Sequence, residues 1–208
     1  MVGKIMQKRA IKTKQKILKT SFKLFAEKGF HGTKINDIAY SADVNKQRIY
    51  AYFNSKENLF SAAVSHAYQL LAESEENFLN LTEKDIPDLT RKLLENNFRF
   101  HIKNPSFWRI LAWSNLEESI HVDIIKRIRT NVFLHLKSLY EKGQKKFFFK
   151  PKVSFETYFF VLSAVSFFYF SNRKTMCKTL QIDLEDDKVK ESVINEINMI
   201  LENKNGIR

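Results

Sequence analysis

The sequence predicts an all-α protein of about nine helices, in which a small basic N-terminal module precedes a larger helical domain. Glycine and proline, which interrupt helices, number only 5 and 3 among 208 residues. Apolar residues recur at intervals of three and four along nearly the whole chain, which is the spacing of one helix face. Hydrophobic residues make up 44% of the chain, enough for a substantial buried core.

Positive charge is concentrated at the N-terminal end. Residues 1–60 contain 13 of the 35 lysines and arginines but only 4 of the 23 acidic residues, so most of the net charge of +12 lies there. This asymmetry is typical of a protein in which one module meets a polyanion. On charge alone, the alternative is a lysine-rich face that is merely solvated.

The first predicted helix has an apolar and a cationic face. Its inward stripe consists of Ile17, Leu18, Ser21, Phe22, Leu24 and Phe25, and its cationic face of Lys12, Lys16, Lys19 and Lys23. Gly29 follows, and glycine commonly ends a helix because it adopts the left-handed conformation easily. One side of this helix is therefore expected to pack while the other stays exposed.

Two shorter helices follow. The first of them begins after Thr33, a natural N-cap, and spans about two turns. Its inward residues are Ile35, Ile38, Ala39 and Ala42. After a tight turn, Asn45 can cap a third helix, with Val44 and Ile49 placed to form a hydrophobic staple. Ile49 and Phe53 are then expected to face inward.

Two short helices joined by a tight turn form the helix-turn-helix design. Its second helix lies in the DNA major groove, about 12 Å wide, where its first turn meets base edges. Tyrosine hydroxyls, the Lys56 ammonium and the open N–H groups of a helix starting at Ser55 suit the flanking phosphates. We therefore expect a helix-turn-helix DNA-binding domain over residues 1–58 and a second, larger helical domain over residues 59–208.

The stretches FAEKGF, TKINDIA, ADV and YAYFNSKENL, in this order between residues 13 and 64, resemble the TetR/AcrR family of transcriptional regulators. Together they are specific, although each alone would be weak. The resemblance implies a cytoplasmic homodimer that binds a palindromic double-stranded DNA operator. It also implies that a small-molecule effector releases the protein from DNA, with repression as the usual outcome.

Transferred residue by residue, the resemblance implies base contacts from Asn36, Lys46, Gln47 and Arg48. It implies phosphate contacts from Thr33, Tyr50, Tyr52 and Lys56. Alternatives stay open, because Tyr50 can be partly core, Arg48 can pair with an acid and Asn36 can support a cap. Two residues depart from the family pattern. Asp43 stands where a turn glycine is usual, and Gln47 stands where a small residue is common, which indicates a different operator.

Further helices are expected beyond residue 60. Pro87 and Pro105 suit the first turns of helices, and a long helix over about 119–146 precedes an aromatic one that starts near Ser154. The run NPSFWRILAWSNLEE more loosely resembles the middle of the ligand-binding domain in part of the family.

The helices expected at about 155–173 and 186–203 are the candidates for a dimer interface, which the resemblance implies is a four-helix contact. The first is apolar on almost every face, so one side can pack inward while another needs a partner. The alternative is that both helices are simply core. The interface residues would be Phe159, Ser163, Ser166, Phe167, Val189, Val193, Ile197 and Ile200.

Aromatic residues of the larger domain are candidates to line a cavity for an apolar or aromatic effector, although aromatics at helical spacing are more often core. These candidates are Phe78, Phe98, His101, Phe107, Trp108, Trp113, His121, Phe133 and Tyr158.

Other function classes are disfavoured. The five histidines lack metal-ligand spacing, no glycine-rich phosphate loop is present, and the single Cys177 has no sign of a catalytic partner. No enzyme, cofactor or metal is therefore expected. One cysteine and an N-terminus without a signal-peptide core favour the cytosol. A basic peripheral membrane protein or a general nucleic-acid-binding protein is the remaining alternative. A helix lying on a membrane surface would not require the turn and staple at residues 42–49.

Overall fold

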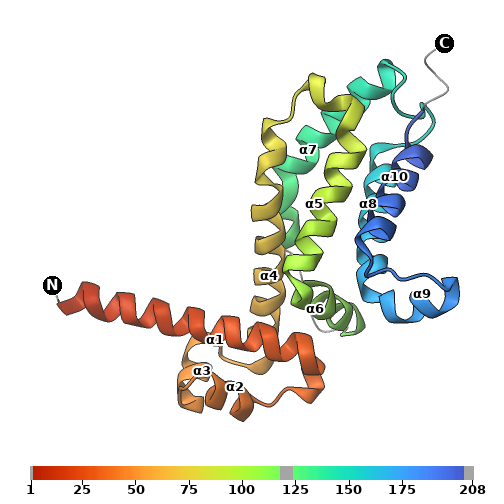
Figure 1. Cartoon of the computed structure of the whole chain (residues 1–208). Coiled ribbons are helices and arrows are strands. Elements are labelled where there is room, and N and C mark those ends of the chain that lie inside the picture. Colours follow the sequence, from red (N-terminus) through yellow and green to blue (C-terminus); the bar gives the residue numbers. More distant parts are fainter. Residues whose placement is uncertain (1, 118–123, 204–208) are drawn as a thin grey trace. The chain divides into compact units, whose positions relative to one another are not determined.

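The computed structural model describes residues 2–117 and 124–203, and side chains within residues 7–117 and 131–203. Over these ranges the chain forms ten α-helices and two 3-10 helices (Figure 1), so the all-α fold class is confirmed. The helices are α1 (Val2–Gly32), α2 (Ile35–Ser41), α3 (Lys46–Phe53), α4 (Lys56–Glu75), η1 (Glu76–Asn80), η2 (Glu83–Asp88), α5 (Leu89–Lys103), α6 (Pro105–Leu116), α7 (Ile124–Lys145), α8 (Phe155–Ser171), α9 (Arg173–Leu180) and α10 (Asp187–Leu201).

The chain packs as two compact units. Unit 1 comprises Met1–Leu71 and Pro105–Ile128, and unit 2 comprises Ala72–Asn104 and Arg129–Arg208. Helix α6 belongs to unit 1, despite its place in the sequence, because it packs along α1. These are units of packing, and the functional boundary expected after residue 58 stays a prediction.

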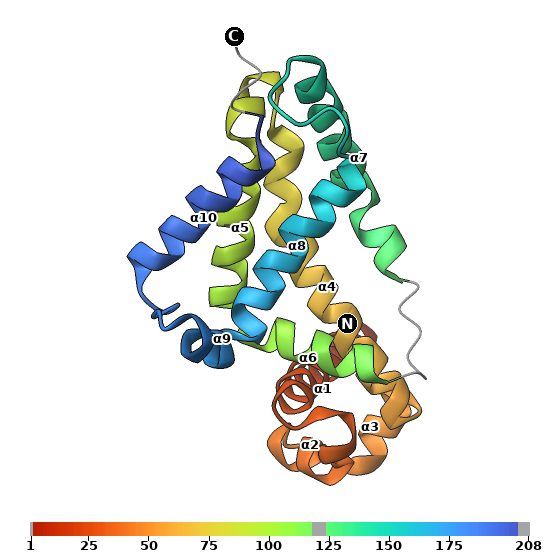
Figure 2. The ribbon, with the colours of Figure 1, turned by 90° about the vertical axis from the view of Figure 1, so that its right-hand side faces the viewer.

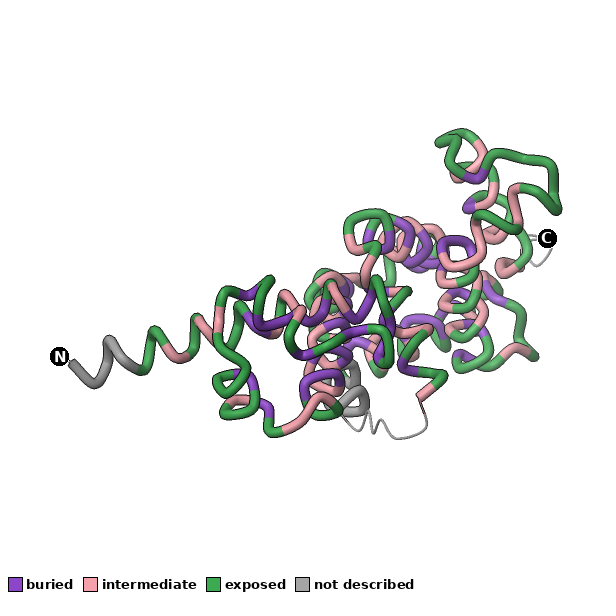
Figure 3. Tube along the Cα trace, turned by 90° about the horizontal axis from the view of Figure 1, so that it is seen from below, coloured by how far each residue is buried: buried purple, intermediate pink, exposed green. Residues whose placement is uncertain are grey.

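Unit 1 is built around α1, which contacts α2, α3 and α6. The rings of Phe25, Phe30 and Phe60 form its aromatic centre, with Phe60 lying 4.9 Å from Phe25 and 5.4 Å from Phe30 between centroids. Buried residues lie where these helices pack together, whereas α1 is largely exposed over residues 7–16 (Figure 3). The amphipathic pattern predicted for α1 is thus confirmed.

Gly29 interrupts α1. Its backbone angles, φ 72° and ψ 179°, are non-helical, which confirms the expected break, although helical geometry resumes as far as Gly32. The Trp113 ring of α6 lies so close that a Cβ added at Gly29 would stand 2.9 Å from it. Glycine therefore provides both the left-handed backbone and the space that brings α6 against α1.

Unit 2 is organised around α5, which packs against α8 and α10 (Figures 1 and 2). The hydroxyls of Thr90 and Tyr158 form a buried hydrogen bond of 3.0 Å between α5 and α8. Arg91 of α5 pairs with Glu95, 2.7 Å away, and also with Glu191 and Asn195 of α10. A buried hydroxyl pair therefore joins α8 to α5, and the Arg91 guanidinium joins α10 to α5.

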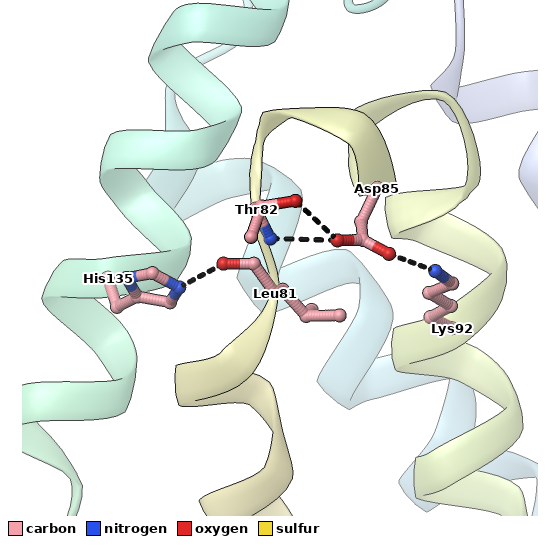
Figure 4. A network of polar contacts seen from close by, with 5 residues as sticks. All are labelled: Leu81, Thr82, Asp85, Lys92 and His135. Carbon is pink, nitrogen blue, oxygen red and sulfur yellow. Dashed lines mark hydrogen bonds and ion pairs between the residues drawn. The ribbon is translucent and has the colours of Figure 1, made fainter.

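A polar network fixes the turn between η1 and α5 (Figure 4). The Asp85 carboxylate accepts hydrogen bonds from the Thr82 N–H at 2.8 Å and from Lys92 at 2.5 Å. These hydrogen bonds, of which the one from Lys92 has the largest effect, lower the pKa of Asp85 to about 2. The Nε2 atom of His135 lies 2.9 Å from the Leu81 carbonyl oxygen, which ties the same turn to α7.

Several boundaries differ from the sequence expectations. Pro105 begins α6 as expected, but Pro87 lies in η2, two residues before α5. The aromatic helix starts after Ser154, whose hydroxyl caps it, and ends at Ser171. Helix α9 was not predicted; it is only eight residues long and none of its residues is buried. In the described part of the chain, no helix is both long and apolar enough to span a membrane.

Candidate nucleic-acid interface

The expected helix-turn-helix is formed by α2, the turn at residues 42–45, and α3. Asp43 has φ 50°, the left-handed conformation expected of the residue that replaces the turn glycine. The Val44 N–H donates to the Ala39 carbonyl at 3.0 Å, which closes the end of α2. Asn45 then caps α3, because its side-chain oxygen accepts the Arg48 N–H at 2.8 Å. The predicted cap is confirmed, and it sets where α3 begins.

Helix α3 has one buried and one exposed face. Ile49 and Phe53 are buried, as expected. Lys46, Gln47 and Arg48 are exposed and occupy the first turn, which is the part of such a helix that meets base edges. The three residues predicted to contact bases from α3 are therefore all exposed in its first turn, while Asn36, also exposed, lies on α2.

Three of the groups predicted for phosphates lie on α3 or just after it: Tyr50 and Tyr52 belong to α3, and Lys56 begins α4. Tyr50 is 39% exposed, so its alternative reading as core is not favoured, whereas Tyr52 and Lys56 are half-buried. The Lys56 ammonium lies 4.4 Å from the Phe30 ring centroid, a cation–π distance that holds it beside α1. The Ser55 hydroxyl accepts the Asn58 N–H at 3.1 Å and so caps α4.

The expectations for Thr33 are wrong. The N-cap of α2 is Lys34, and Thr33 is fully buried. Its hydroxyl donates a hydrogen bond of 2.7 Å to the carbonyl oxygen of Gly29, the residue at which α1 is interrupted. The same hydroxyl lies 3.2 Å from the Leu24 carbonyl oxygen. A side chain without exposed surface cannot contact a phosphate, so Thr33 supports the α1 break instead.

Sequence reasoning missed two features of this surface. Tyr40 of α2 is 90% exposed, and its place outside the stripe of Ile35, Ile38, Ala39 and Ala42 was the signal for this exposure. A groove of about 590 Å³ also runs between α1 and α3. It is lined by Arg9, Ala10, Lys12, Thr13, Lys16, Arg48 and Tyr52. The recurring lysines of the first helix were the sequence signal for one wall of this groove. The other wall is α3, whose position beside α1 depends on tertiary packing and has no local signal.

Eight of the nine residues suggested for an effector pocket lie in the described part of the chain, where they divide between the two units. Phe107, Trp108 and Trp113 belong to unit 1, where Phe107 packs on Tyr68 and Trp113 on Gly29. His121 lies outside the described residues. The other five belong to unit 2: Phe78, Phe98, His101, Phe133 and Tyr158. No cluster of histidine, cysteine or acidic residues within the described part could hold a metal ion.

Within unit 2, Phe98 and His101 share a cluster with Tyr169 and Phe170. The Phe98 ring lies 4.7 Å from Tyr169, and the His101 ring stacks on Phe170 at 5.1 Å. Burial lowers the pKa of His101 to about 4, so its imidazole is neutral at physiological pH. Phe98 also lines a groove of about 370 Å³ between α5 and α10. Phe133 and Tyr158 instead pack in a second aromatic cluster around Phe155.

The residues expected at a dimer interface are only partly exposed. Ser166 is buried, and its hydroxyl donates to the Leu162 carbonyl at 2.7 Å, so its assignment to the interface is wrong. Phe159, Ser163 and Phe167 are half-buried, as are Val189, Val193 and Ile197, whereas Ile200 is 59% exposed. The outer face of α8 is formed by Phe160, Ala164 and Phe168, spaced four apart. Because α8 is apolar all round, periodicity could not tell which face points outward.

A capped helix-turn-helix with an exposed, cationic first turn on its second helix defines a DNA-binding protein of the helix-turn-helix class. Comparison with known families agrees. Residues 17–63 match the domain described as "Bacterial regulatory proteins, tetR family", and residues 88–199 match the "Tetracyclin repressor-like, C-terminal domain". The chain belongs to the TetR family of transcriptional regulators.

Individual relatives extend this likeness over most of the chain. The HTH-type transcriptional repressor NicS of Pseudomonas putida is 30% identical over 189 residues, covering 89% of each chain. The crystal structure of HlyIIR, a hemolysin II transcriptional regulator, is 26% identical, covers 94% of this chain and 99% of its own, and has a TM-score of 0.67. A TetR family regulator from Marinobacter aquaeolei, 18% identical, shares the fold with a TM-score of 0.72 over 95% of this chain and 100% of its own.

Proposed function

We propose that the protein is a cytoplasmic homodimeric repressor that binds a palindromic operator and leaves it when a small apolar or aromatic effector binds. The observation that carries the DNA-binding part is the first turn of α3. There the Asn45 cap and the buried Ile49 leave Lys46, Gln47 and Arg48 exposed together. Relatives described as transcriptional repressors support the proposed outcome.

Base recognition is assigned to the first turn of α3, with Asn36 of α2 as an additional contact. Long polar side chains there can form hydrogen bonds with base edges, each good pair being worth about 1–3 kcal/mol of discrimination. Tyr50, Tyr52, Lys56 and the capped start of α4 are assigned to phosphates, which fix orientation without reading sequence.

Dimerisation is assigned to the outer face of α8 together with the exposed part of α10. Phe160 and Phe168 are 70% and 49% exposed, and an aromatic stripe of this kind is unfavourable in water unless another surface covers it. Met199 and Ile200 give α10 an exposed apolar end. A two-fold dimer also doubles the base contacts of one short helix, because each copy reads one half-site.

The effector is assigned to the groove between α5 and α10. Phe98, Ile102 and Ile194 supply its apolar surface, and charged side chains such as Arg99 and Lys190 surround them. An effector there can act only if it binds more tightly to a conformation with low operator affinity. Parting α10 from α5 would separate Arg91 from Glu191. Because α10 is also assigned to the dimer contact, such a movement would change how the two α3 helices of the dimer are spaced on the operator.

Selection of bound fragments from random duplex DNA tests the function directly. We expect an inverted repeat to emerge, and we expect alanine at Lys46, Gln47 or Arg48 to change the preferred bases. Lys56→Ala should instead weaken binding to all duplexes alike and reduce the salt slope by about 0.9 for each phosphate that the variant no longer neutralises. An unchanged preference in all three α3 variants would contradict the assignment of bases.

Thermal-shift screening of small aromatic compounds then tests the effector site. A compound that raises the melting temperature and lowers operator affinity should lose both effects in Phe98→Ala. The matched control is Phe107→Ala, which changes a buried phenylalanine of unit 1. If the control loses the response and the Phe98 variant keeps it, the effector binds elsewhere.

A further inference from the structure

The groove between α1 and α3 concentrates positive charge outside the helix-turn-helix itself. Arg9, Lys12 and Lys16 line it from α1, and Arg48 lines it from α3. We propose that this groove binds the phosphodiester backbone of the same duplex that α3 contacts. The inference rests on the proposed function and adds α1 to the DNA interface.

The spacing of the cations suits a DNA strand. Arg9 and Lys16 are seven residues apart on one helix, which corresponds to about 10 Å along its axis. Each strand of B-DNA carries one negative charge per roughly 3.4 Å of helix axis. The groove can therefore meet two or three consecutive phosphates, and Tyr52 adds a hydroxyl donor on the α3 side.

Acidic competition in the groove is weak. Lys16 pairs with Asp43, whose carboxylate lies 3.8 Å from the Lys16 ammonium. The Asp43 side chain is 97% exposed, so this pair contributes little and a phosphate can displace it. Thr13 uses its hydroxyl to bond the Arg9 carbonyl at 2.9 Å, so the cations, rather than Thr13, supply the attraction.

Because Arg48 and Tyr52 form one wall, a strand held in the groove touches the recognition helix as well as α1. Backbone contacts on both sides of a recognition helix fix its depth and register in the major groove. The α1 contacts are thus positioning contacts, and they are expected to raise affinity for every duplex without changing the preferred sequence.

Two charge-matched double variants of the full-length protein test this inference. Lys12→Gln with Lys16→Gln removes two cations that line the groove. Lys19→Gln with Lys23→Gln removes two exposed cations of the same helix that do not line it. Affinity for the selected operator and for a scrambled duplex is measured between about 50 and 200 mM salt.

The groove variant should bind both duplexes about tenfold more weakly or worse, because fewer phosphates are neutralised, and its salt slope should fall by about 0.9 for each of them. The control should resemble wild type, and circular dichroism should show that both variants stay helical. Equal affinities and slopes in the two variants would overturn the inference, as would a changed sequence preference with an unchanged slope. If the wild-type protein itself prefers no duplex, the proposed function fails instead.

A neutral operator backbone supplies an independent test. Methylphosphonate groups placed singly along the operator should weaken wild-type binding at the positions that face the groove. The groove variant should lose sensitivity at those positions and the control variant should keep it. Sensitivity retained in the groove variant would overturn the inference.

Discussion

Asp43 combines backbone strain with charge at one position of the turn. Its left-handed backbone disfavours any side chain with a Cβ, although Asp tolerates it better than most residues. We expect Asp43→Ala to be less stable than Asp43→Gly by about 1 kcal/mol, measured by urea unfolding at one protein concentration. Both substitutions remove the same carboxylate, so their DNA affinities should agree. Equal stabilities would show that the turn carries no strain at this residue.

His101 predicts a dependence of stability on pH. Its folded pKa of about 4 lies below the unfolded value near 6.5, so between these values the unfolded chain binds a proton that the folded chain does not. The free energy of unfolding should therefore be highest above pH 6.5 and should fall as the pH drops towards 4, by at most about 1.4 kcal/mol per pH unit. Urea unfolding at pH 7 and pH 5 measures this, and His101→Phe should flatten the difference. The same pH dependence in that variant would show that other groups cause it.

At the scale of elements, the break in α1 determines whether α6 can pack there. Gly29→Ala would combine a left-handed alanine with a Cβ 2.9 Å from the Trp113 ring, and we expect a loss of about 2–3 kcal/mol in unfolding free energy. Gly32→Ala is the matched control. Its Cβ would meet only the Lys28 side chain, at 3.4 Å, and we expect a change within about 0.5 kcal/mol. Similar losses in both variants would contradict this account of the break.

Helices with strong local signals were predictable from the sequence. The amphipathic first helix, the break at Gly29, the Asn45 cap and the start of the aromatic helix near Ser154 all follow from interactions within a few residues. The N-cap predicted at Thr33 was wrong because a threonine hydroxyl can either cap the helix that follows or donate to a carbonyl of the helix before it. The sequence does not show which, since the second role depends on the carbonyl that the break in α1 leaves available.

The candidate sites were less predictable, because they depend on contacts between distant segments. The exposed first turn of α3 was expected, but the groove beside it requires α1 and α3 to lie side by side. For α8, apolar residues on every face hide which stripe points outward, so Ser166 was assigned to the interface and Phe160 was not. The aromatic residues divide between two units because α6 returns to α1, a long-range contact without a local signal.

At the scale of the whole molecule, operator binding should require the dimer. Phe160→Glu combined with Phe168→Glu places two charges on the outer face of α8, and we expect monomers by sedimentation at micromolar concentration. Operator affinity should fall at least about a hundredfold, since each monomer keeps only one half-site. Leu79→Glu, at a similarly exposed apolar residue of η1, is the control and should leave the dimer intact. A dimer that survives the double substitution would move the interface to another surface.

The packing of Trp113 against Gly29 gives the protein an internal optical probe. The chain has two tryptophans, Trp108 and Trp113, and both lie on α6. Ultraviolet emission excited at the red edge of absorption therefore originates in unit 1, at its α1–α6 contact, and not among the phenylalanines and tyrosines of unit 2. With Trp108 replaced by phenylalanine, the wavelength and quenching of the remaining indole would follow in real time whether α6 stays seated on α1 as DNA is bound and released.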